Sequence, residues 1–289
     1  MKLNMFYRIY YRHRFEKSNF LRKIYLTIIL PLSYLVNLIF IQKKNDLDKF
    51  VKNNEILYEK DLNYLFEYFN SDKGEKYSNQ YIKPIKKNDN LIQAHGYSKI
   101  YEKYFYKIKN KNLNIMEIGS FYGNASAALY FYFKNSKIFS ADINPDMYRY
   151  KAKRLDNFYV NSSERTSIEK QIVNKKIKFD VIIEDASHML KDQIISLFIL
   201  FPSLKKNGLF IIEEVDFPEK REDMRIGHKK PDLKTILNNV ILKKDFNSEY
   251  ILESEKKYFL LNCAEIKFFK GNFNEIAIIR KKWFILLNV

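Results

Sequence analysis

One stretch, from Phe179 to Glu214, constrains the fold more than any other part of the chain. It holds two apolar runs, Val181–Ile183 and Leu209–Ile212, and each run ends in two acidic residues. The residues between the runs have the apolar spacing of a helix, and Gly208 stands where we expect a left-handed turn into the second run. Two continuous apolar strands joined by one helix lie parallel in a sheet covered on both faces. The stretch therefore predicts a strand–helix–strand crossover.

The acidic residues that end these two runs are expected to meet. Asp185 and His188 follow the first strand, and Glu213 and Glu214 end the second. Neighbouring parallel strands open their carboxyl ends on one edge of the sheet, which is where open α/β sheets bind ligands. Carboxylates crowded there are costly unless a positive charge lies between them, and a divalent cation with oxygen ligands is the simplest answer. Glu184 is expected on the other side of the strand, paired with a lysine.

The segment from Asn114 onward predicts a strand, a glycine-containing loop and a helix, with Glu117, Gly119 and Gly123 in the loop. A dinucleotide site needs Gly-x-Gly-x-x-Gly, and here an acid and two aromatic residues interrupt that pattern. Glu-x-Gly-x-x-x-Gly suits S-adenosylmethionine, because the glycines let the chain turn under the methionine part and Glu117 can bind an ammonium group. Asp142 ends the next strand, where it can accept both ribose hydroxyls. The alternative is that the glycines serve only a tight turn.

The order of the predicted elements indicates the fold class. Strands and helices alternate through the second half of the chain, and two strands, 265–269 and 274–280, form a hairpin after them. We therefore predict an α/β, Rossmann-like fold, with a mostly parallel sheet, helices on both faces and a C-terminal antiparallel hairpin. Residues 45–70 are expected to be helical. We divide the chain into a basic, apolar membrane-associating segment (1–44), a helical lead-in that contributes to the active site (45–110) and the Rossmann-like domain (111–289).

The first segment combines charge with an apolar run. Residues 1–23 hold seven basic residues and one acidic residue, and Ile24–Ile41 contains no charge. Eighteen residues are at the lower limit for a membrane-spanning helix, and Pro31 divides the run. A single span would also send the main domain outside, because basic termini stay cytoplasmic. We expect a cytoplasmic protein, peripheral on the inner face of the membrane, whose segment lies on an anionic membrane surface. The alternative is an ordinary helix packed on the main domain.

The formal charge of +17 could indicate nucleic acid, but the lysines are spread along the chain and no RNA-binding signature is present. We therefore expect no nucleic-acid partner. A single cysteine, Cys263, excludes an internal disulfide and fits a reducing compartment.

From about Leu62 to Arg280 the chain resembles class I S-adenosylmethionine-dependent methyltransferases of the macrolide-sugar and rhamnosyl O-methyltransferase type, whose relatives are often labelled cephalosporin hydroxylases. The resemblance is carried by these stretches: SDKG (71–74), HGYSKIYEKYF (95–105), MEIGSFYG (116–123), ADINP (141–145), EDASH (184–188) and FPSLKKNGLFIIEE (201–214). EDASH followed by IIEE at this spacing is the most specific of these signals.

The resemblance implies roles for particular residues. It implies that Mg²⁺ is bound by Asp185, Glu213 and Glu214 and that His188 is the base for a sugar hydroxyl. It implies that the adenine end of the cofactor lies near Asn161 and Ser162. The chain departs from the family pattern at two places: Asn161 and Ser162 stand where Gly-Asp-Gln is usual, and the last acid of the metal set is Glu214 rather than Asp. The remaining residues that could line the substrate or cofactor pocket are Lys73, His95 and Tyr97. The alternative is that Lys73 belongs only to a turn and that His95 and Tyr97 belong to a packed loop.

These observations give a first hypothesis and two alternatives. The first is an S-adenosylmethionine- and Mg²⁺-dependent O-methyltransferase, acting on a sugar hydroxyl of a glycan or glycoconjugate and able to form a homo-oligomer. The second is a catalytically silent binding or scaffold protein on the same fold. The third is a nucleic-acid methyltransferase, which is supported only by the positive net charge of the chain.

Overall fold

The structure is a computed structural model of the 289-residue chain. It describes residues 18–38, 44–78, 91–225, 227–228 and 230–283, together with residues 3, 6, 7, 11 and 15. Several basic residues near the N-terminus lie outside the described residues, namely Lys2, Arg8, Arg12, Arg14, Lys17 and Lys43. Most of the polar stretch before His95 also lies outside them.

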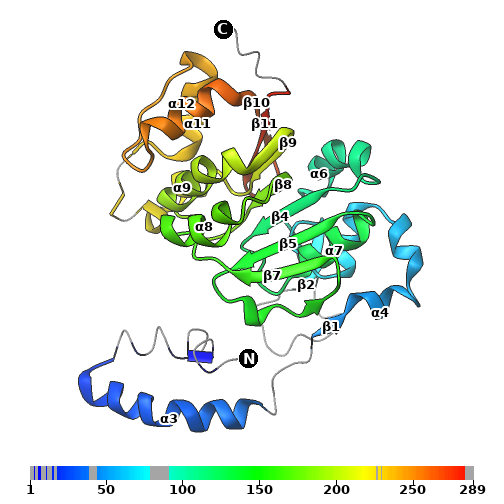
Figure 1. Ribbon diagram of the computed structural model, residues 1–289, viewed down its shortest axis with the longest axis vertical. Coiled ribbons are helices and arrows are strands. Elements are labelled where there is room, and N and C mark those ends of the chain that lie inside the picture. The colour runs from blue at the N-terminus through cyan, green and yellow to red at the C-terminus, as the bar shows by residue number, and fades with distance from the viewer. Residues whose placement is uncertain are drawn as a thin grey trace.

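A seven-stranded sheet forms the centre of the fold (Figure 1). In spatial order its strands are β10 (Cys263–Lys270), β11 (Glu275–Lys281), β9 (Leu204–Ile212), β8 (Phe179–Glu184), β4 (Asn114–Ile118), β5 (Lys137–Asp142) and β7 (Leu155–Tyr159). The strands from β9 to β7 are parallel, whereas β11 runs antiparallel to β9 and β10 antiparallel to β11. The predicted mostly parallel sheet with a C-terminal hairpin is confirmed.

Helices cover both faces of this sheet, because its central strands are apolar on both sides. One face carries α8 (Arg165–Gln171), α9 (Leu190–Leu200), α11 (Leu233–Lys243) and α12 (Glu253–Asn262). The other carries α5 (Leu62–Tyr68), α6 (Ser98–Phe105) and α7 (Asn124–Tyr132). Alternation along β8 separates the two cores: Ile182 packs toward α9, and Val181 and Ile183 pack toward α7. The crossover predicted from Phe179 to Glu214 is β8–α9–β9, and β8 and β9 are neighbours.

The lead-in before β4 is less regular than the sequence predicts. The single helix expected over residues 45–70 is wrong: the structure has α4 (Leu47–Val51), a 3-10 helix (Glu55–Glu59) and α5. Asp46 caps α4 by accepting from the Lys49 amide, and Asp61 caps α5 by accepting from the Tyr64 amide. Acidic N-caps favour new helix starts over continuation, so they divide the segment.

The other short elements connect or flank these layers. Two small sheets pair β1 (Asn45–Asp46) with β6 (Tyr150–Lys151) and β2 (Lys76–Ser78) with β3 (Leu91–Gln93). Short helices occupy loops, namely α10 (Phe217–Lys220) and the 3-10 turns Tyr106–Ile108, Pro145–Met147, Val173–Lys175, Phe201–Ser203 and Glu222–Arg225.

The apolar run near the N-terminus forms α3 (Phe20–Leu38), which begins four residues before the uncharged run and contains Pro31. In Figure 1 it lies apart from the sheet and its covering helices. None of the described helices combines the length and hydropathy that a membrane crossing needs.

The turn into β9 differs from the expectation for Gly208. β9 already begins at Leu204, so Gly208 lies inside the strand, and the left-handed residue is Asn207, with φ 60°. Asparagine tolerates this conformation better than most residues with a side chain, because its short polar group bonds locally.

Glu184 does not pair with a lysine, and that expectation is wrong. Its side chain is completely buried, and neither carboxyl oxygen has a hydrogen-bond partner in the described part of the chain. Burial raises the pKa of Glu184 to about 8, and the neighbouring Asp185 and Asp192 add to the effect. The core therefore holds this carboxyl in its neutral form at pH 7.

This burial predicts a pH dependence of stability. Between the ordinary carboxyl pKa of 4.5 and about 8, the folded protein keeps a proton on Glu184 that the unfolded chain has lost, so stability falls as pH rises. Glu184→Gln removes the titration. We expect its free energy of unfolding, relative to the parent, to rise by about 1–3 kcal/mol from pH 5 to pH 8, measured in urea. The surface variant Asp156→Asn should show no such trend, and a flat difference for both variants would contradict the assignment.

Candidate functional site

Two glycines shape the loop between β4 and α7. Gly119 has φ 88°, and a Cβ placed on it would lie 1.8 Å from the backbone oxygen of Asp185. Gly123, with φ 79°, is the residue that caps α7, and a Cβ there would meet the ring of Tyr148 at 2.4 Å. Left-handed backbone and close approach both require glycine. The loop is thus packed against β8, with no room for side chains at these two positions.

A cavity of about 330 Å³ opens beside this loop at the carboxyl ends of the parallel strands. Five of the six expected cofactor residues line it, namely Glu117, Gly119, Asp142, Asn161 and Ser162. Asp185 and His188, which follow β8, line it as well, and so does Lys73. Gly123 lies next to this wall, at the start of α7. The volume of this cavity is in the range found for small-molecule binding sites.

Asp142 is fixed at the end of β5 by two backbone amides. Its Oδ2 accepts from the Phe121 amide at 2.8 Å, and its Oδ1 accepts from the Asn144 amide at 2.7 Å. Burial raises the pKa of Asp142, and the two amides oppose that rise. A carboxylate has about four acceptor positions, so two amide contacts leave acceptors for ligand hydroxyls.

Glu117 lies at the inner end of the cavity and is almost completely buried. It accepts a hydrogen bond from the Ser126 hydroxyl, and its Oε1 is 3.8 Å from Lys73 Nζ. Burial raises the pKa of Glu117 to about 7, against the opposing effects of Lys73 and Ser126. The carboxyl is therefore close to its titration point at neutral pH, where a ligand cation would favour its charged form.

The acids of β8 and β9 meet, as the sequence predicts, and the buried cation found between them is Lys73. Its Nζ contacts Asp185 Oδ2 and lies 2.9 Å from Glu213 Oε2, while the side chain is 2% exposed. Burial lowers the pKa of Lys73, but Asp185 and Glu213 outweigh burial and hold this pKa well above its usual value. The charge crowding expected from the sequence is thus relieved by the chain itself.

Glu213 is fully engaged by protein groups. One oxygen faces Lys73 Nζ and the other accepts from the hydroxyl of Tyr101 on α6. Burial raises the pKa of Glu213 well above its usual value, and Asp185 adds to the rise. The sequence did not identify Tyr101 as a site residue, because its spacing on α6 matches a core position and it does pack in the core.

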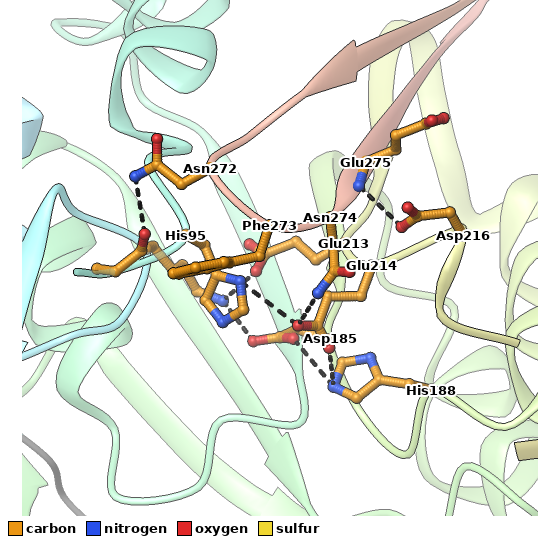
Figure 2. Close-up of polar contacts among 12 residues, drawn as sticks. His95, Asp185, His188, Glu213, Glu214, Asp216, Asn272, Phe273, Asn274 and Glu275 are labelled. Atoms are coloured by element: carbon orange, nitrogen blue, oxygen red, sulfur yellow. Dashed lines mark hydrogen bonds and ion pairs between the residues drawn. The ribbon is translucent and has the colours of Figure 1, made fainter. Parts of the chain in front are cut away.

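Glu214 joins the two site histidines (Figure 2). Its Oε2 lies 3.0 Å from His188 Nε2, and its Oε1 lies 3.4 Å from His95 Nδ1 and accepts from Asn274 Nδ2 at 2.9 Å. Asp185 Oδ1 lies 3.7 Å from the same His188 nitrogen. Asn274 belongs to the hairpin turn, so the antiparallel end of the sheet contributes to the site, which no motif indicated.

Two of these residues have an unusual backbone. His188 has φ 55° and Glu214 has φ 52°, both in the left-handed region. Such a conformation costs free energy in residues with side chains, and it is often found at functional sites. Here it turns His188 and Glu214 toward each other from the ends of different strands.

His95 and Tyr97 lie beside the acids rather than on the cavity wall. Their rings stack at 5.4 Å, and Tyr97 is completely buried, whereas Lys73 does line the cavity. The backbone N–H of Asn272 donates to the His95 carbonyl at 2.8 Å, and its side-chain amide donates to the Ala94 carbonyl at 2.8 Å (Figure 2), which fixes this loop to the hairpin. Of the three residues expected near a pocket, His95 reaches Glu214 and Tyr97 serves packing.

The donor set was compared with the needs of a magnesium ion. Among the described residues, no three His, Cys, Asp or Glu side chains are arranged as a metal site. Lys73 and Tyr101 hold the two oxygens of Glu213. Asp185 Oδ1 and Glu214 Oε2 face His188 instead. Mg²⁺ is commonly bound through one or two carboxylates with water or substrate in the other positions. Asp185 and Glu214 carry carboxylate oxygens of the kind that Mg²⁺ prefers, and in the structure those oxygens contact side chains of the protein. Glu213 is the buried support of these two acids.

Comparison with known proteins places the fold. No protein-family model matches the chain. A curated relative, the 8-demethyl-8-alpha-L-rhamnosyl tetracenomycin-C 2'-O-methyltransferase of Streptomyces olivaceus, is 24% identical over 128 residues, which are 42% of this chain and 33% of that protein. The chain therefore matches about a third of the length of this relative.

Solved structures of MycE, a methyltransferase from the mycinamycin biosynthetic pathway, superimpose with TM-scores of 0.56 and 0.57. The sequences are 16% and 17% identical, and the matches cover 77% of this chain and 55% of MycE. The first was determined with Mg and SAH, and the second with Mg, SAH and mycinamycin VI. Both likenesses agree with the resemblance carried by the sequence motifs, and the chain has the Rossmann-like fold of class I methyltransferases.

The Lys73 arrangement predicts a large effect on stability. Lys73→Ala leaves buried carboxylates without their cation, which typically costs about 3–5 kcal/mol in the free energy of unfolding. Guanidinium denaturation at pH 7 measures this loss, and added Mg²⁺ should recover part of it. Lys99→Ala is the control, because Lys99 pairs with Glu75 at 3.0 Å but its side chain is 84% exposed. An exposed pair contributes about 0–1 kcal/mol, so equal losses in the two variants would contradict the role of Lys73.

Proposed function

We propose that this protein is an S-adenosylmethionine-dependent O-methyltransferase that acts on a sugar hydroxyl of a glycan or glycoconjugate. The observation that carries the proposal is the continuous cavity wall from Asp142 and Asn161, at one end, to Asp185 and His188 at the other. A methyl donor held at the first end would present its methyl group to an acceptor at the second. The likeness to the rhamnosyl tetracenomycin-C 2'-O-methyltransferase supports a sugar as the acceptor class.

The cofactor end has carboxylates for two polar parts of the donor. Asp142, fixed by two amides, would receive the ribose hydroxyls, and Glu117 would receive the ammonium group near the glycine loop. Asn161 and Ser162 would contact the adenine end. The backbone of Asn161 donates to Ser167 Oγ at 3.0 Å, which holds this part of the wall in place.

The acceptor end supplies a base. The imidazole of His188 takes the proton of the sugar hydroxyl. The carboxylates of Glu214 and Asp185, whose oxygens lie 3.0 Å and 3.7 Å from His188 Nε2, stabilise the resulting imidazolium. The hydroxyl oxygen then forms a bond to the methyl carbon while the carbon–sulfur bond breaks, which releases S-adenosylhomocysteine. Most of the acceleration comes from the alignment of donor and acceptor.

Mg²⁺ is the second cofactor in this proposal, and Asp185 and Glu214 would hold it. When bound, the ion lowers the pKa of a coordinated hydroxyl. Lys73 and Tyr101 keep Glu213 in place behind these two carboxylates. The buried ion pairs thus set the position of the acids before any ligand arrives.

Replacing the base tests the reaction. We expect His188→Ala to lower methyl transfer by about 10²–10⁴-fold, the usual loss on removing a general base. The assay follows a labelled methyl group from S-adenosylmethionine to nucleotide-linked and lipid-linked sugars. His228→Ala is the matched control, because His228 contacts Tyr250 away from the acids. Binding of S-adenosylmethionine should be retained in both variants, and near-normal turnover of His188→Ala would remove His188 from the mechanism.

Calorimetry tests the two cofactors separately. S-adenosylmethionine should bind the full chain. The affinity for Mg²⁺ should be at least about tenfold lower in Asp185→Asn and in Glu214→Gln than in the parent chain. Asp180→Asn, a carboxylate on the same strand that pairs with Lys205, is the control and should bind Mg²⁺ normally. Cofactor binding without turnover on any sugar would favour a silent binding protein, and failure to bind S-adenosylmethionine would overturn the proposed function.

A further inference from the structure

Helix α3 has two apolar faces, and its own chain covers one of them. Leu26, Leu30 and Tyr34 follow one another at four-residue spacing and so lie on the same side of the helix. They form a cluster with aromatic residues of the segment before the helix, namely Phe6, Tyr7, Tyr11 and Phe15. The rings of Phe6 and Tyr34 meet edge to face at 5.6 Å. This side of α3 is therefore occupied.

The opposite side of α3 is apolar and exposed in the described part of the chain. We call it the open face, and its residues are Leu21, Ile24, Tyr25, Ile28, Leu32, Leu35 and Val36. Successive residues turn by about 100° around a helix, which places Leu21, Ile28 and Leu32 opposite Leu30. Their exposed fractions are high, 76% for Leu21, 65% for Ile28 and 62% for Leu32. Single exposed apolar residues are ordinary, but a contiguous stripe of this length marks an interaction surface.

Charge identifies the kind of partner. No acidic residue occurs from Lys17 to Asn45, whereas Arg22 stands in the first turn of α3 and Lys43 follows the helix in the sequence. Lys23 and Lys44 lie over the rings of Phe15 and Tyr148. Residues 1–23 hold seven basic residues and one acidic residue. An apolar stripe flanked by basic residues complements a surface that is anionic outside and apolar just beneath, which is the composition of an anionic lipid leaflet.

The geometry also selects an orientation. A helix whose second side is already packed against its own chain offers only one side to lipid, so it lies in the plane of the interface. None of the described helices meets the length and hydropathy of a membrane span. We infer that α3 docks in plane on an anionic membrane surface through the open face, with Leu21, Ile28 and Leu32 in the acyl boundary. This surface is separate from the proposed active site.

Sedimentation of the full chain with vesicles tests the inference. The protein should bind vesicles of equal parts phosphatidylglycerol and phosphatidylcholine, bind phosphatidylcholine alone more weakly, and lose binding as salt rises. The double variant Ile28→Asp, Leu32→Asp should bind the anionic vesicles at least about tenfold more weakly than the parent chain, because charges replace two apolar side chains that the lipid would bury.

The matched control is the double variant Leu242→Asp, Leu261→Asp. These leucines are 78% and 69% exposed, but they lie on α11 and the α12 helix of the main domain. The control should bind vesicles like the parent chain. Vesicle binding that survives in Ile28→Asp, Leu32→Asp overturns the inference. It is also overturned if the parent chain does not bind the vesicles. If the variant in that case converts a dimer to a monomer, a second copy of the chain covers the open face instead.

Discussion

The ion-pair network around Lys73 is the interaction on which the rest of the site depends. Two neighbouring parallel strands bring carboxylates to one edge of the sheet, and burial makes that arrangement costly unless a cation compensates it. Lys73 reaches this point from the lead-in, and Tyr101 of α6 completes the hydrogen bonding of Glu213. The lead-in is therefore tied to the Rossmann-like sheet by charge as well as by apolar packing. Remove that tie, and the acids lose the geometry that the proposed chemistry needs.

Much of the fold could be predicted because its signals are local. Continuous apolar runs ending in acids specify buried parallel strands, and the pattern around Gly119 specifies a strand–loop–helix. The convergence of Asp185 with Glu213 follows from strand adjacency alone, once β8 and β9 are neighbours. These features depend on periodicity and on the handedness of the crossover, which a single sequence contains.

The partners of the acids could not be predicted, because they come from distant parts of the chain. Lys73 is 112 residues from Asp185, and Asn274 is 60 residues from Glu214. A buried lysine in a turn looks like a solvated one, and Tyr101 looks like any aromatic residue of a helical core. The complete burial of Glu184 was missed for a related reason: the residue ends a strand whose far face is covered by α9, not by solvent. Local pattern gives the direction of a side chain, whereas tertiary packing decides what it meets.

The contact of Gly119 with the Asp185 carbonyl has a mechanical consequence. The donor-binding loop and the acid-bearing strand touch backbone to backbone, and a single added carbon would force them apart. The two halves of the proposed reaction centre are thus in direct contact, and the pairing of β4 with β8 sets the distance between them.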